Sequence, residues 1–78
     1  MTTTTESVIN IIKDINPKTE VDAGNTGAVL FDLGLDSLDH ASVLLQIEEE
    51  FGIKIPDAES ELLVTVDAIV KFIGDRAS

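Results

Sequence analysis

Apolar residues near the start of the chain recur with the spacing of one helical face. They are Val8, Ile11, Ile12 and Ile15, which follow the i, i+3, i+4, i+7 pattern of a buried stripe. Thr3 and Glu6 precede them at the spacing of a capping box. Because the residue before a proline avoids the helical region, Pro17 marks the end. The pattern predicts a first helix with a structural role.

A long loop is expected from Asn16 to Ala28, where Gly24 and Gly27 permit turns. These glycines lack the lysine and the preceding strand of a phosphate-binding loop. Val21 is the expected apolar anchor of the loop. The next apolar residues, Val29, Leu30 and Phe31, are expected to rejoin the core.

The second predicted helix carries two apolar faces. It is capped by Asp36 or Ser37 and runs to about Phe51, where Gly52 suits the left-handed position after a helix end. At about 100° per residue, Val43, Leu44, Ile47 and Phe51 share one face, and Leu38, Ala41 and Leu45 share nearly the opposite one. We call the second set the outer stripe; Ser42, Glu48 and Glu49 flank it. Since a surface helix normally needs one apolar face, the outer stripe is expected to meet a partner.

The rest of the chain predicts a connector, a short helical turn and a last helix. Residues 53–56 form the connector and residues 57–63 the turn. Thr65 caps the last helix, whose face is Val66, Ile69, Val70 and Ile73, with Ala68 and Phe72 near its edge. Residues from Gly74 onward are expected to fray. With no period-2 segment, the prediction is one all-α domain over residues 1–78: a small four-helix bundle of three longer helices and one short one, with a long loop after the first.

Charge and composition exclude several classes of function. Acids outnumber bases 15 to 5, for a net charge of -10, so nucleic acid and anionic membranes are poor partners and basic protein patches are good ones. No run of 18 apolar residues is present, so no stable membrane insertion is expected, and we expect a monomer in the cytoplasm. Without cysteine the chain has no thiol of its own, and one histidine argues against a zinc site. Asp32, Asp36 and Asp39 do not match a calcium loop, so no metal site is predicted.

Ser37, at the start of the second helix, admits three interpretations. It is a helix cap, or a nucleophile with His40 as its base, or an attachment point for a group added by another enzyme. The nucleophile is disfavoured because the surrounding acids oppose a developing oxyanion. A phosphodiester on Ser37 would meet free backbone N–H groups and the positive end of the helix dipole.

Four segments together resemble the acyl carrier proteins in order and spacing. They are Phe31-Asp32-Leu33-Gly34-x-Asp36-Ser37-Leu38-Asp39, Glu48-Glu49-Glu50-Phe51-Gly52-Ile53, Ile55-Pro56 and Thr65-Val66. The resemblance covers most of the chain from Val29 to Ile73. It implies that Ser37 carries 4′-phosphopantetheine, attached from coenzyme A by a phosphopantetheinyl transferase, and that acyl groups ride on this arm as thioesters. It also implies a pocket between the helices that shelters an apolar chain.

The resemblance further implies a partner-recognition surface and a non-catalytic role. The family's recognition positions map onto Asp36, Leu38, Asp39, Ala41, Leu45, Glu48 and Glu49. The expected partners are acyl-transferring, condensing or ligating enzymes with basic patches. Two positions depart from the family pattern: Ser42 stands where a glutamate is usual, and Leu35, where a small residue is usual, is expected to add apolar bulk to the contact surface.

These departures leave the pathway open between fatty acid biosynthesis and specialised lipid or secondary metabolite synthesis. A peptidyl or aminoacyl carrier is the nearest alternative, although Gly34-Leu35-Asp36 favours the acyl type. An unmodified acidic helical adaptor that binds a basic partner is the alternative from another class. No catalytic residue is predicted.

Overall fold

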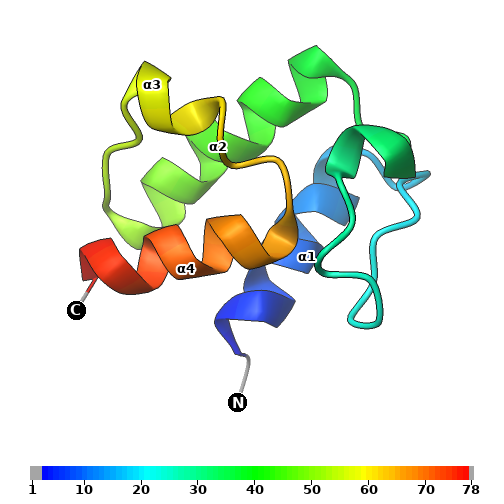
Figure 1. Cartoon of the computed structure of the whole chain (residues 1–78), viewed down its shortest axis with the longest axis horizontal. Helices are drawn as coiled ribbons and strands as arrows, with labels where there is room; N and C mark the ends of the chain where they lie inside the picture. Colours follow the sequence, from blue (N-terminus) through cyan, green and yellow to red (C-terminus); the bar gives the residue numbers. More distant parts are fainter. Residues whose placement is uncertain (1–2, 78) are drawn as a thin grey trace.

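Helices account for the regular structure of residues 3–77, the part of the chain that the computed structural model describes. In order they are α1 (Thr4–Ile15), the 3-10 helix η1 (Leu30–Leu33), α2 (Ser37–Phe51), α3 (Asp57–Ser60) and α4 (Val66–Ala77) (Figure 1). Three longer α-helices, one short one and a long loop after the first confirm the predicted all-α architecture. Within residues 3–77 no helix has the length and apolarity that crossing a membrane requires.

The first helix begins and ends where the sequence indicates. The hydroxyl oxygen of Thr3 accepts the Glu6 N–H at 3.1 Å, which is the cap. The same hydroxyl donates to the Glu6 carboxylate at 3.2 Å. The helix ends at Ile15, with Asn16 as its C-cap, so Pro17 lies just beyond it. Ile15 is only half-buried, and Ile9, which the pattern omitted, is buried instead.

Side chains from α1, α2 and α4 fill one core. The fully buried ones are Val8 and Ile12 from α1, Val43 and Ile47 from α2, and Val66 and Ile69 from α4, with Val21 and Leu30 from the segment between α1 and α2. Helix α1 contacts both α2 and α4. The long loop therefore has its predicted anchor, because Val21 lies in this core.

Two of the three residues expected to rejoin the core after the loop remain exposed. Leu30 is buried, but Val29 is 38% exposed and Phe31 is 43% exposed, so the prediction for these two is wrong. The reason is η1, which the sequence did not reveal. In a 3-10 helix residues three apart share a side, so Leu30 and Leu33 face inward together and Phe31 faces outward.

Leu35 is buried, so the expectation that it adds apolar bulk to the contact surface is wrong. Its exposed fraction is 2%. Gly34 ends η1 in the left-handed region, with φ of 99°, and this turn reverses the chain so that the Leu35 N–H donates to the Leu30 carbonyl at 3.2 Å. The apolar bulk of Leu35 therefore supports the core beneath the start of α2.

The C-terminal half matches the prediction in part. The short helix α3 ends at Ser60, before the expected Leu63, and in α4 Phe72 is buried whereas Val70 is only half-buried. The Thr65 hydroxyl oxygen accepts the Ala68 N–H at 3.0 Å, which confirms the cap of α4. This helix continues to Ala77, so the expected fraying from Gly74 is wrong for the described residues; Ser78 lies outside them. Arg76 stabilises the last turn, since its guanidinium lies 4.8 Å from the centre of the Phe72 ring.

Candidate functional site

Ser37 occupies the first helical position of α2, and its neighbour caps the helix. Asp36 is the N-cap: its backbone is extended and its carboxylate oxygen Oδ1 accepts the Asp39 N–H at 2.8 Å. The choice between Asp36 and Ser37 as cap is thus resolved in favour of Asp36. Ser37 is exposed, and none of the hydrogen bonds within residues 3–77 uses its hydroxyl. Chemical modification of the Ser37 hydroxyl would therefore break no hydrogen bond within these residues.

The start of α2 offers backbone donors to an anion attached at Ser37. The His40 N–H donates to the Asp36 carbonyl at 2.9 Å, and the Asp39 N–H is used by the Asp36 side chain. The N–H groups of Ser37 and Leu38 make no bond within the described residues. These two donors and the positive end of the helix dipole favour a phosphate group on the serine oxygen. The residues present therefore fit a phosphodiester at this position.

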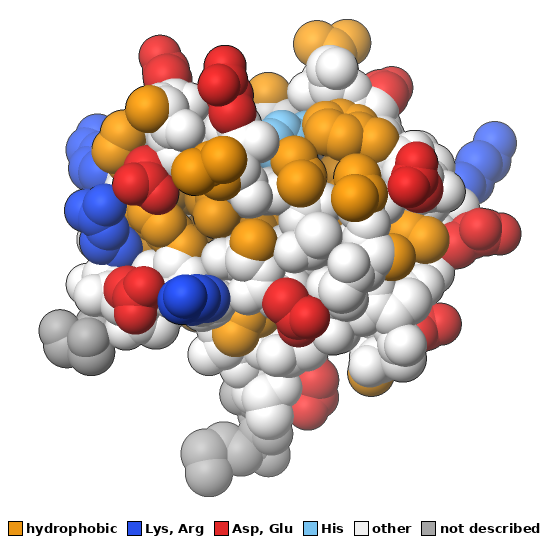
Figure 2. All heavy atoms as spheres, viewed as in Figure 1, with side chains coloured by type: hydrophobic (Ala, Val, Ile, Leu, Met, Phe, Trp, Pro, Cys, Tyr) orange, Lys and Arg blue, Asp and Glu red, His pale blue; other side chains and the backbone are white. Residues whose placement is uncertain are grey.

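His40 is engaged away from Ser37. Its Nε2 lies 2.8 Å from the Leu63 carbonyl oxygen, in the connection between α3 and α4. Its ring also packs against Phe31, with 5.3 Å between ring centroids. The side chain is half-buried, and in Figure 2 the pale blue histidine is partly covered by hydrophobic side chains. His40 thus contacts groups from two other segments and gives Ser37 no base.

The two apolar faces of α2 differ in burial, as the helical phase predicts. Val43, Leu44 and Ile47 are buried, whereas Leu38 is 80% exposed, Leu45 is 58% exposed and Ala41 is exposed. Phe51 is half-buried. The outer stripe therefore does not contribute its full apolar area to the core. It lies on the helix that begins at Ser37.

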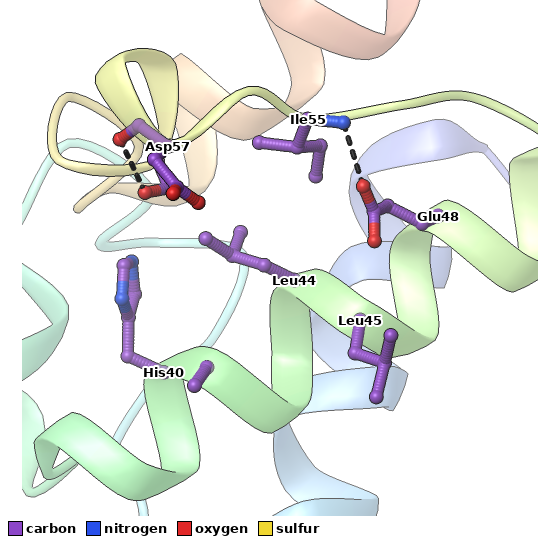
Figure 3. Close-up of a pocket in the computed structure, with 8 residues that line it drawn as sticks. His40, Leu44, Leu45, Glu48, Ile55 and Asp57 are labelled. Carbon is purple, nitrogen blue, oxygen red and sulfur yellow. Dashed lines mark hydrogen bonds between the residues drawn. The ribbon is translucent and has the colours of Figure 1, made fainter.

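Two of the predicted recognition acids also hold the fold together. Asp39 is half-buried, and its Oδ2 accepts a hydrogen bond from the Asn16 side chain at 2.9 Å. Glu48 is half-buried, and its Oε2 accepts the Ile55 N–H at 2.7 Å (Figure 3). Asp36 and Glu49 are exposed. A change at Asp39 or Glu48 would therefore alter packing as well as surface charge.

A groove of about 360 Å³ lies between α2 and α3 (Figure 3). Its lining residues are His40, Ala41, Leu44, Leu45 and Glu48 from α2, Ile55 from the connector, and Asp57 and Ser60 from α3. Sequence reasoning assigned no residue to this pocket: it placed Ala41, Leu45 and Glu48 on the recognition surface and Leu44 in the core. It did not single out Ile55, Asp57 or Ser60, because no local pattern relates the short α3 to α2. This groove lies where the resemblance implies a pocket between helices.

The family model described as phosphopantetheine attachment site matches residues 6–73. The chain belongs to this family, whose members carry a covalently attached 4′-phosphopantetheine group. It is therefore a phosphopantetheine-bearing carrier protein of the kind to which acyl carrier proteins belong, as the sequence resemblance predicts. A domain of this family is a carrier and not a catalytic unit, and such domains interact with phosphopantetheinyl transferases and partner enzymes.

Proposed function

We propose that this protein is an acyl carrier whose arm is attached to Ser37. The observation that carries the proposal is made at the start of α2. There Asp36 caps the helix, so the Ser37 hydroxyl is not needed as a cap and remains exposed. A transferase would join Ser37 Oγ to the pantetheine phosphate of coenzyme A, and the nucleotide half of coenzyme A would leave. The Ser37 and Leu38 N–H groups would then hold the phosphodiester.

The absence of cysteine from the sequence indicates what the prosthetic group must supply. Because the chain contains no cysteine, the terminal thiol of the arm supplies the only sulfur nucleophile at this site. Acyl groups would be held there as thioesters. The chain's own task is to fix the attachment point, shelter the cargo and present it to partner enzymes, so we propose no catalytic residue.

Partners are proposed to recognise the outer face of α2. The proposed surface combines the outer stripe with acids, and comprises Asp36, Leu38, Asp39, Ala41, Leu45, Glu48 and Glu49. Its support is the exposure of Leu38 and Leu45 together with the net charge of -10, which favours basic partner patches. The partners would be the transferase and acyl-transferring, condensing or ligating enzymes of fatty acid or specialised lipid and secondary metabolite synthesis.

We further propose that residues 1–78 act as a single, monomeric carrier domain in the cytoplasm, where coenzyme A is made and used. The extent of the family match, residues 6–73, supports a single carrier domain.

The test is the intact mass of the protein after incubation with coenzyme A and a broad-specificity phosphopantetheinyl transferase. Ser37→Ala is the test variant and Ser42→Ala is the matched control, since Ser42 is also an exposed serine of α2. Wild type and Ser42→Ala should each gain the mass of one phosphopantetheine, and Ser37→Ala should gain none. If Ser37→Ala gains the same mass as wild type, the arm is attached elsewhere. If no protein is modified while a known carrier is, an unmodified adaptor becomes the better interpretation.

A further inference from the structure

The side chain of Asn16 contacts the chain on both sides of Ser37. Its Nδ2 donates to the Gly34 carbonyl oxygen at 3.2 Å and to Asp39 Oδ2 at 2.9 Å. Gly34 lies before Ser37 in the sequence, and Asp39 lies after it in the first turn of α2. One amide group at the end of α1 therefore joins both ends of the segment that contains the proposed attachment point.

Asn16 is itself held in place by the end of α1. It is the C-cap of this helix, and its backbone N–H donates to the Ile12 carbonyl oxygen at 2.9 Å. Its side-chain Oδ1 accepts the Lys18 N–H at 3.1 Å, so the amide nitrogen and the amide oxygen are both engaged. Because Ile12 is fully buried, the end of α1 is anchored in the core. Asn16 thus transmits the position of the core to the segment around Ser37.

The two groups that accept from this amide decide where Ser37 points. Gly34 has a φ of 99°, and glycine has wide conformational freedom, so the hydrogen bond to its carbonyl restrains the most adaptable point of the turn. Asp39 follows Ser37 by two positions in α2, which places it about 200° around the helix axis. Holding Asp39 against the end of α1 therefore turns Ser37 outward. The half-burial of Asp39 and the exposure of Ser37 agree with this arrangement.

We propose that Asn16 is a positioning residue for the modification of Ser37. It holds the segment from Gly34 to Asp39 in the arrangement that presents the serine hydroxyl to the transferase, so that the enzyme does not have to order this segment at the cost of rate. The proposal rests on the function proposed above, because it requires attachment at Ser37. It goes further in giving a role in that reaction to a residue outside the surface proposed for partner recognition.

Steady-state kinetics of the transferase separate positioning from recognition. The carrier concentration is varied at saturating coenzyme A, at a temperature where circular dichroism shows that every variant is folded. Asn16→Ala removes both donated bonds and should lower kcat about tenfold, because the reacting hydroxyl is no longer held in place. The KM for the carrier should stay within about twofold, because the outer stripe is unchanged. Asn16→Ser is the milder second variant: its hydroxyl replaces at most one donor, so its kcat should lie between the other two.

The matched control is Asn25→Ala. Asn25 is also a half-buried asparagine of the loop after α1. Its side chain accepts the Asp22 N–H at 2.8 Å and donates to the Glu20 carbonyl oxygen at 2.9 Å. Within residues 3–77 it makes no hydrogen bond to residues 34–39. Asn25→Ala should therefore leave kcat and KM near the wild-type values.

Native-state hydrogen exchange separates a local effect from a loss of global stability. The Leu35 and Asp39 N–H groups report on the segment around Ser37, since they donate to the Leu30 carbonyl and to the Asp36 carboxylate. In Asn16→Ala their exchange should become about tenfold faster relative to core amides of α2. In Asn25→Ala this ratio should not change.

Two kinetic results would overturn the proposal. One is a fall in kcat for Asn16→Ala that is no larger than the fall for Asn25→Ala. The other is a tenfold rise in KM at unchanged kcat, since this would make Asn16 a partner contact. Intact mass tests attachment separately: wild type left unmodified, or Ser37→Ala modified, contradicts the proposed function, whereas equal rates of modification at Ser37 contradict only the role of Asn16.

Discussion

Two alanine substitutions on α2 test whether its two apolar faces have different tasks. Ile47→Ala and Leu38→Ala each remove three carbons from the same helix. Ile47 is 0% exposed and Leu38 is 80% exposed. Removing three fully buried carbons costs about 2.4 kcal/mol in transfer free energy alone, and a cavity raises the cost of Ile47→Ala to about 2–5 kcal/mol. For Leu38, with one fifth of its surface buried, the same arithmetic yields about 0.5 kcal/mol.

Thermal and urea unfolding followed by circular dichroism measure both values. For a domain of this size about 1 kcal/mol corresponds to about 4–8 °C in Tm, so Ile47→Ala should lower Tm by at least about 8 °C and Leu38→Ala by only about 2–4 °C. In the transferase assay the order of the two variants should be reversed, and Leu38→Ala should have the larger effect. It should slow modification about tenfold, because a central interface contact is lost. If Leu38→Ala unfolds the protein as readily as Ile47→Ala does, the outer stripe is core and the proposed recognition surface fails.

Three further substitutions test particular contacts. Asp36→Ala should cost about 1 kcal/mol of unfolding free energy because the cap on the Asp39 N–H is lost, whereas Asp36→Ser should keep most of it; equal losses would contradict the capping role. Glu48→Gln should destabilise by about 1 kcal/mol more than Glu49→Gln, since only Glu48 accepts the Ile55 N–H, and chemical denaturation of the pair decides the matter. Thr19→Val should stabilise by about 1 kcal/mol, because the buried Thr19 hydroxyl has no partner within the described residues; a lower Tm would show that the hydroxyl is paired.

Local patterns predicted the helices and the faces of α2 because both depend on residues close together in sequence. Helical phase alone separated Ile47 from Leu45, and burial agrees with that separation. The capping residues Thr3 and Thr65 were also visible, since a cap and its N–H partner lie three residues apart. Ser37 was singled out for the same reason: it lies where an acidic turn becomes an apolar helix.

The errors arose where contacts distant in sequence decide the outcome. Leu35 is buried although exposure was expected, and Phe31 is exposed although burial was expected. The reason is that η1 and the left-handed Gly34 set the direction of the chain before α2. The structural tasks of Asp39 and Glu48 depend on Asn16, 23 residues away, and on a connector amide, seven residues away. The groove depends on the packing of α3 against α2, and a turn as short as residues 57–60 carries no periodic signal of its own.

The most direct test of the central claim is the modification state of the protein purified from the cells that naturally make it. Trypsin should release residues 19–54 as one peptide, because no lysine or arginine lies between Lys18 and Lys54. We predict that this peptide carries the mass of one phosphopantetheine and that fragmentation places it on Ser37. A peptide that is wholly unmodified, or modified at Ser42, would contradict the assignment of Ser37 as the attachment point.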